Sequence, residues 1–119
     1  MSTIKANDIQ SASGGIPTVK GQRLIPTAWV HFDGTGTVAI IDSENVSSIT
    51  DKGTGNYEAN LITAMSNASY AVTSNTVGNV AMCAGPSNTS AAYLQCYVTT
   101  SGALIDRNPV SAIILGGQA

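Results

Sequence analysis

The sequence predicts an all-β protein, a small antiparallel β-sandwich of about eight strands that follows an extended N-terminal arm. Two observations predict the sandwich. From Thr27 onward, short apolar or alternating runs recur at intervals of about 8–12 residues. Glycine-rich turn signals, such as those at 33–36 and 51–55, separate these runs. The 119 residues leave room for one such domain, which we place at 27–119.

Residues 1–26 form the predicted arm. They show neither helical nor strand periodicity, and Pro17 and Pro26 favour extended backbone at the residues before them. A disordered tail is the alternative, but the segment holds more apolar residues than a solvated linker needs. We therefore interpret them as anchors that attach the arm to a partner or a neighbouring subunit: Ile4, Ile9, Ile16, Val19, Leu24 and Ile25.

The strands of the sandwich are predicted from their apolar runs. The clearest is 56–62, where Tyr57, Ala59 and Leu61 alternate with polar residues, as in a strand with one buried face. The run 85–90 is predicted to be a loop, because it contains glycine, proline, asparagine and serine. The complete set of predicted strands is 29–32, 37–41, 46–50, 56–62, 70–74, 77–84, 92–100 and 110–115.

Composition limits the possible partners. Charged residues make up 10% of the chain, and the net charge is −2. The five basic residues are scattered, so we expect no binding to nucleic acid. A polar surface with so few charges gives little protection against self-association, which favours assembly with copies of itself or with neighbours.

The two cysteines, Cys83 and Cys96, both lie in apolar runs. An even number permits one disulfide, but the runs favour a pair of buried free thiols.

Catalytic chemistry has few candidates in this chain. Its one histidine, His31, lies in a predicted strand on the same face as Trp29, a setting more typical of packing than of a general base. Three carboxylates, Asp33, Asp51 and Asp106, lie beside turns, where aspartate usually caps the backbone. We therefore predict that the protein is not an enzyme and uses no cofactor or metal, although copies of His31 around a trimer axis are a conceivable metal site.

One series of motifs resembles a known family. The runs WVHFDGTGTVAI at 29–40, NVSSITD at 45–51 and GTGNY at 53–57 are followed by TAM at 63–65, YVTTSGALID at 97–106 and VSAIILG at 110–116. Together they resemble the β-rich C-terminal module of tail fibres and related virion appendage proteins of tailed bacteriophages, over residues 27–116. The resemblance implies a homotrimer located in the virion. Because residues 1–10 are polar and no membrane span occurs, we expect synthesis in the host cytoplasm, release by lysis and no membrane insertion.

The resemblance implies a short trimeric tail fibre that docks by its arm and contacts a host surface glycan or protein. Candidate ligand residues lie in two predicted loops: Asn75, Asn79, Ser87, Asn88 and Thr89. Trp29, Tyr93 and Tyr97 are candidate aromatic contacts, with core or subunit packing as the alternative. Two other functions stay open: a capsid decoration (cement) or tail structural protein without a host ligand, and a glycan depolymerase, which would need a pair of carboxylates.

Overall fold

The computed structural model describes residues 3, 5–7, 10–14, 18–19, 22–23 and 27–117. Within the arm, β1 (Thr18–Val19) pairs with β2 (Gln22–Arg23) in antiparallel fashion. The extended conformation of the arm stays a prediction. Of the predicted anchors, Val19 is described by its backbone alone, and the others lie outside the described residues: Ile4, Ile9, Ile16, Leu24 and Ile25.

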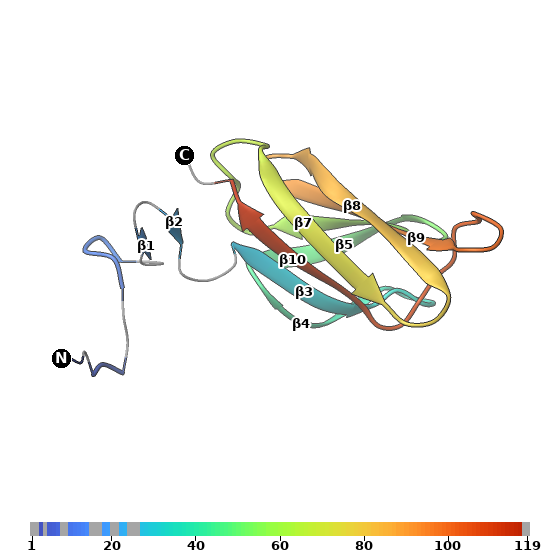
Figure 1. Cartoon of the computed structure of the whole chain (residues 1–119), viewed down its shortest axis with the longest axis horizontal. Coiled ribbons are helices and arrows are strands. Elements are labelled where there is room, and N and C mark those ends of the chain that lie inside the picture. Colours follow the sequence, from blue (N-terminus) through green and yellow to red (C-terminus); the bar gives the residue numbers. More distant parts are fainter. Residues whose placement is uncertain are drawn as a thin grey trace.

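The rest of the described chain forms two four-stranded antiparallel sheets, which confirms the all-β prediction (Figure 1). Sheet 1 has the order β4-β3-β10-β7, and sheet 2 has the order β5-β6-β9-β8. The first and last strands of the sandwich, β3 and β10, are thus neighbours in the middle of sheet 1. The strands are β3 (Ala28–Asp33), β4 (Ala39–Glu44), β5 (Val46–Gly53), β6 (Asn56–Leu61), β7 (Tyr70–Thr76), β8 (Val80–Asn88), β9 (Ala91–Val98) and β10 (Val110–Gly116).

The alternation of buried and outward residues explains which face of β3 and which face of β6 lies against the core. In β3 every second residue is buried, starting at Ala28, and in β6 every second residue is buried, starting at Tyr57. Successive side chains of a strand point to opposite faces, so each strand presents one face to the core and one outward. The predicted faces of 56–62 and of His31 with Trp29 are therefore confirmed.

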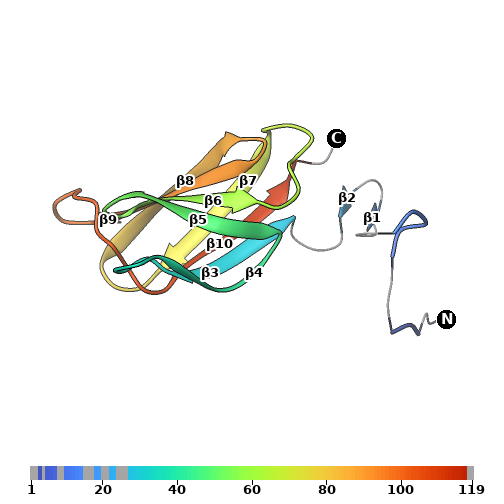
Figure 2. The same cartoon turned by 180° about the vertical axis from the view of Figure 1, so that it is seen from behind.

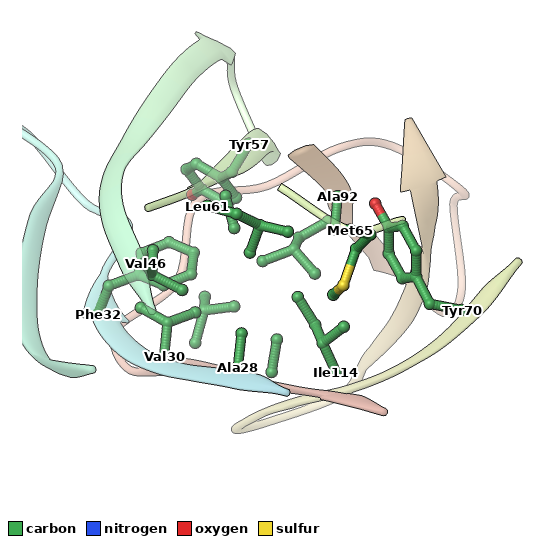
Figure 3. Close-up of a cluster of buried hydrophobic side chains, with 14 of the residues drawn as sticks. Ala28, Val30, Phe32, Val46, Tyr57, Leu61, Met65, Tyr70, Ala92 and Ile114 are labelled. Carbon is green, nitrogen blue, oxygen red and sulfur yellow. The ribbon is translucent and has the colours of Figure 1, made fainter. Parts of the chain in front are cut away.

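The core lies between the two sheets. Figure 3 shows Val30, Phe32 and Ile114 of sheet 1 pointing toward side chains of sheet 2 and its connections, such as Leu61 and Met65. The rings of Phe32 and Tyr57 meet edge to face, with centroids 5.2 Å apart and planes at 77°. This is a favoured geometry for aromatic pairs, and it joins β3 to β6 across the sandwich.

The connections define two ends of the sandwich, visible in Figures 1 and 2. The arm end is where β3 begins and β10 finishes, and it also holds the segment 62–69 and the β8–β9 turn. The loop end holds the β3–β4 loop (34–38), the β5–β6 turn (54–55), the β7–β8 turn (77–79) and the long β9–β10 loop (99–109). Every strand of the sandwich therefore runs between the arm end and the loop end.

The prediction that 85–90 form a loop is wrong. Residues 85–88 continue β8, and a two-residue turn at 89–90 leads into β9. Proline is tolerated here because β8 is an edge strand and the pairing shifts by a bulge between Pro86 and Asn88. Composition suggested a loop, whereas the position at the edge of the sheet permits a strand.

Between β4 and β5 a one-residue corner carries the chain from sheet 1 to sheet 2. Asn45 makes this corner with φ of 59°, a left-handed conformation that asparagine tolerates better than most residues. Its side chain donates to the Thr27 carbonyl (3.2 Å) and accepts from the Thr63 N–H (2.8 Å). The corner thus fixes the place where the arm joins the sandwich.

The loop end is closed by a buried junction around Tyr57. The Tyr57 hydroxyl lies 2.8 Å from the Gly34 carbonyl and 2.9 Å from Asp106 Oδ1, and the Gly55 N–H donates to the same Oδ1 at 2.7 Å. A Cβ at Gly34 would lie 2.5 Å from the Tyr57 hydroxyl oxygen, so that position requires glycine. Burial, followed by the hydrogen bond to Asp106, raises the pKa of Tyr57 well above its ordinary value.

Replacing Tyr57 with phenylalanine should lower the free energy of unfolding by about 1–3 kcal/mol, because the buried Gly34 carbonyl loses this hydroxyl and Asp106 Oδ1 keeps only the Gly55 N–H. Urea denaturation measures this. Tyr97→Phe is a matched control, since its hydroxyl lies on the outer face and bonds to Gln95, and it should cost less than about 0.5 kcal/mol. Equal losses in the two variants would show that the junction adds nothing to stability.

Candidate functional site

The candidate ligand residues do not form one site. Asn75 lies in β7 rather than in the predicted loop, and with Asn79 of the β7–β8 turn it lies toward the loop end. Ser87, Asn88 and Thr89 lie at the arm end. The nine residues of β8 separate the two groups, a distance of roughly 30 Å along the strand. These residues therefore do not form a single ligand-binding cluster.

Three of these residues accept hydrogen bonds through their backbone carbonyls, and the Thr89 carbonyl accepts from the Met65 N–H at 2.7 Å. The Asn79 carbonyl accepts from the Thr99 N–H at 3.2 Å, and the Asn88 carbonyl accepts from the Tyr70 hydroxyl at 2.8 Å. The Asn88 side chain also caps the β8–β9 turn by accepting from the Ser90 N–H at 2.7 Å. Ser87 instead hydrogen-bonds to Glu58, on the outer face of sheet 2.

The candidate aromatic residues lie on opposite sides of the sandwich. Trp29 is half-buried on the outer face of sheet 1, while Tyr93 and Tyr97 are half-buried on the outer face of sheet 2. Tyr93 and Tyr97 come from one strand, so they can contact the same ligand, but Trp29 cannot join them. The structure therefore offers two separate outer faces for binding.

The outer face of sheet 1 carries an apolar patch, which we define as Trp29, Ile113 and Leu115. Trp29 is the cross-strand partner of Ile113, and Leu115 follows two residues later on the same face of β10. Ile113 is 44% exposed and Leu115 is 50% exposed. Both lie in the predicted strand 110–115, and the structure shows that its buried face is the one with Val110, Ala112 and Ile114.

Two hollows flank β10 on this outer face. One, of about 270 Å³, is lined by Trp29, His31, Ser111 and Ile113. The other, of about 280 Å³, lies on the opposite side of β10 and includes Thr73 and Asn75 in its lining. The face thus has relief as well as apolar side chains, both of which favour contact with another molecule.

His31 and Ser111 form the one pair on this face with a suggestion of catalytic chemistry. His31 Nδ1 lies 2.7 Å from Ser111 Oγ, and Asp42 is the cross-strand neighbour of His31. Hydrolysis through such a group also needs free N–H donors for an oxyanion. Both β3 and β10 have pairing strands on each side, so their N–H groups are committed to the sheet. The arrangement suits a structural hydrogen bond better than a nucleophile.

The turn carboxylates have structural roles. Asp33 accepts from the Thr35 hydroxyl and N–H, and these bonds hold the pKa of Asp33 below its ordinary value. Asp51 caps Gly53 at 3.0 Å, as predicted from its turn position. Asp106 differs from the prediction, because it binds Gly55 and Tyr57 of distant segments rather than its own turn. A glycosidase acid needs a raised pKa, which is opposite to the shift at Asp33.

The outer face of sheet 2 combines aromatic and polar side chains. Tyr93, Gln95 and Tyr97 of β9 alternate with buried residues, and Asn56 and Glu58 of β6 lie opposite Gln95 and Tyr93. The Tyr97 hydroxyl donates to Gln95 Oε1 at 2.7 Å. Lys52 Nζ lies 2.9 Å from Glu58 Oε2, so the two charges on this part of the face neutralise each other. Sequence reasoning found the tyrosines but missed Gln95 and Glu58.

The cysteines are free thiols on opposite faces of sheet 2. Cys96 is buried, and burial raises its pKa to about 11, which keeps the thiol neutral and unreactive at physiological pH. Cys83 is exposed, so the expectation of two buried thiols is wrong for this residue. Cys83 pairs in register with Gln95 and Cys96 with Met82, which points the two sulfurs away from each other.

Comparison with known proteins identifies no relative: no family model, no curated protein and no solved structure matches the chain. Within the described ranges, no three histidine, cysteine or acidic side chains gather in a way that would hold a metal ion. In the part of the chain that the structure describes, no helix is long and apolar enough to cross a bilayer.

Acid should weaken the fold partly through Glu58. The hydrogen bond from Lys52, aided by one from Ser87, lowers the pKa of Glu58 in the folded state. A lowered folded pKa stabilises the protein above the unfolded pKa of about 4.3, and this contribution is lost as the pH falls through the folded value. The free energy of unfolding should therefore drop less steeply between about pH 5 and pH 3 in Glu58→Gln than in the unmodified chain.

Urea denaturation across this pH range measures the difference, expected to be under about 1 kcal/mol for a surface pair. Lys52→Gln removes the other half of the ion pair and should flatten the pH dependence in the same direction. Retention of the original slope in both variants would contradict the assignment.

Proposed function

We propose that this chain is a structural module of a bacteriophage virion, a short tail fibre that associates as a homotrimer and is attached by residues 1–26. It has no catalytic role in this proposal. The series of motifs across residues 27–116 supports it, and so does the all-β fold. The observation that carries the proposal is the apolar patch on the outer face of sheet 1.

The apolar patch favours a subunit contact. Its side chains project from β3 and β10, which are the middle strands of the sheet and therefore form a rigid base. Exposed apolar side chains on a weakly charged surface promote association, because burying them removes apolar area from water. A second copy of the chain, with the same low charge, is the partner that this surface fits best.

The arm supplies a way to complete that contact. Trp29 lies two residues from Thr27, where the arm joins the sandwich, so the apolar patch lies at the arm end. A fully extended chain of 26 residues spans up to roughly 80 Å, enough to reach a neighbouring copy. Its six apolar anchors would then lie against the patch of that neighbour or against another virion protein. The outer face of sheet 2 and the loop end take no part in this contact and stay available to a host ligand.

A capsid decoration or tail structural protein without a host ligand is the second candidate. The same apolar patch and arm favour it, because both would serve contacts between virion proteins alone. The two candidates differ in whether the module contacts a host cell.

Mass measurement by light scattering tests the subunit contact. The unmodified chain should have three times the mass of one chain, and Leu115→Asp should shift it toward monomer by placing a charge in the apolar patch. Leu104→Asp makes the same substitution at another exposed leucine, on the loop end, and should keep the trimer. A monomer for the unmodified chain at high concentration would contradict the proposal.

Competition with adsorption tests the host contact. Purified trimer added to host cells should reduce adsorption of the phage that encodes it, because it occupies the same surface ligand. An unchanged adsorption rate, for a chain that is found in the virion by mass spectrometry, would favour the decoration or tail structural role.

A further inference from the structure

The ring of Tyr93 lies flat on the outer face of sheet 2. Tyr93 stands between Glu58 of β6 and Gly85 of β8 in the register of the sheet. A Cβ at Gly85 would lie 2.9 Å from the Tyr93 hydroxyl oxygen and 3.1 Å from two ring carbons. The ring therefore extends over the Gly85 backbone, with one side covering this buried glycine and the other side turned outward.

A second ring lies further along the same strand. Tyr97 is four residues from Tyr93 on the same face, a separation of about 13 Å along a strand. Gln95 lies between the two tyrosines, and its side chain is fixed by the hydroxyl of Tyr97. The strand thus presents two aromatic rings with an amide between them.

The polar groups beside these rings are held in place by one another. Asn60 pairs in register with Ala91, which places it diagonal to Tyr93, and it donates to Thr50 Oγ1 at 2.8 Å and to Ser48 Oγ at 3.1 Å. The Glu58 carboxylate is held by Lys52 at 2.9 Å. Amides and hydroxyls offer both donors and acceptors, and their fixed positions lower the entropy that a ligand must remove on binding.

We propose that the outer face of sheet 2 is a saccharide-binding platform that takes a neutral glycan chain lying along β9. Sugar rings have apolar C–H faces, which can cover the exposed side of an aromatic ring, and hydroxyl edges, which suit the amides and the Glu58 carboxylate. A neutral ligand is favoured because Lys52 and Glu58 compensate each other. A chain of several sugar units is needed to reach both Tyr93 and Tyr97.

This platform deepens the proposed function and rests on it for one point, that the natural glycan belongs to a host surface. It assigns assembly to sheet 1 and ligand binding to sheet 2. The apolar patch on sheet 1 exposes the branched aliphatic residues Ile113 and Leu115, which offer no partners to sugar hydroxyls. Three platforms in a trimer would raise a weak single-site affinity through multivalency.

Nuclear magnetic resonance with the full chain, labelled with ¹⁵N, tests the platform. The probes are maltohexaose, cellohexaose and the hexamer of N-acetylglucosamine, each added up to about 10 mM, a range that detects weak binding. At least one probe should shift the amide signals of β9 and of the facing residues of β6. Signal shifts confined to the turn at 77–79, or no shifts with any probe, would overturn the platform.

Variants separate ring stacking from a general effect on the fold. Tyr97→Ala should raise the dissociation constant about tenfold, which is the effect of losing one aromatic contact. Tyr97→Phe keeps the ring but frees Gln95, so it should weaken binding less than Tyr97→Ala does. Tyr93→Phe also keeps its ring, and Thr73→Ala on the outer face of sheet 1 is the control that should retain full binding. A loss in Tyr97→Phe as large as that in Tyr97→Ala would overturn stacking. A change of oligomeric mass in Tyr97→Ala would show that this face is a subunit contact and would overturn the platform.

The test also distinguishes the platform from the wider function. Detection of the chain in purified virions by mass spectrometry, together with no saccharide binding, removes the platform and leaves the virion role. Saccharide binding by a chain that is absent from virions removes the virion role and leaves the platform.

Discussion

The arrangement of the loops at the loop end depends on the hydrogen bonds of the Tyr57 hydroxyl. This hydroxyl comes from sheet 2, but its acceptors are the Gly34 carbonyl of the β3–β4 loop and Asp106 of the β9–β10 loop. Asp106 in turn holds the β5–β6 turn through Gly55. Three connections that are far apart in sequence are thus fixed around one buried phenol, and four residues of the motif runs have a structural role in this junction: Gly34, Gly55, Tyr57 and Asp106.

The same junction allows the two outer faces to differ. Inward-facing groups fill the core and close the loop end. The outward side chains of β3, β10, β6 and β9 are therefore not needed for either. Sheet 1 uses its outward positions for exposed apolar residues, while sheet 2 uses them for tyrosines, amides and one compensated ion pair. A sandwich with two chemically distinct faces can make two kinds of contact at once.

The strands and their inward faces were predictable because alternation is local: Tyr57, Ala59 and Leu61 carry the pattern in their own segment. The candidate ligand residues could not be placed, because their separation depends on the length and course of β8. Asp106 looked like a local turn cap, but its partners lie about fifty residues earlier in the chain. Cys83 looked buried from its apolar neighbours, yet the register of an edge strand turned it outward.

The central position of β3 affects how the domain bears load. Any force transmitted through the arm enters at Thr27, whose N–H and hydroxyl are bonded to the Ile114 and Gly116 carbonyls of β10. From there it passes into a strand that is paired on both sides, by β4 and by β10. When the resistance comes from the loop end, both ladders are loaded in shear, so many hydrogen bonds share the tension instead of opening one after another. Two ladders, rather than one, would therefore have to give way before β3 left the sheet.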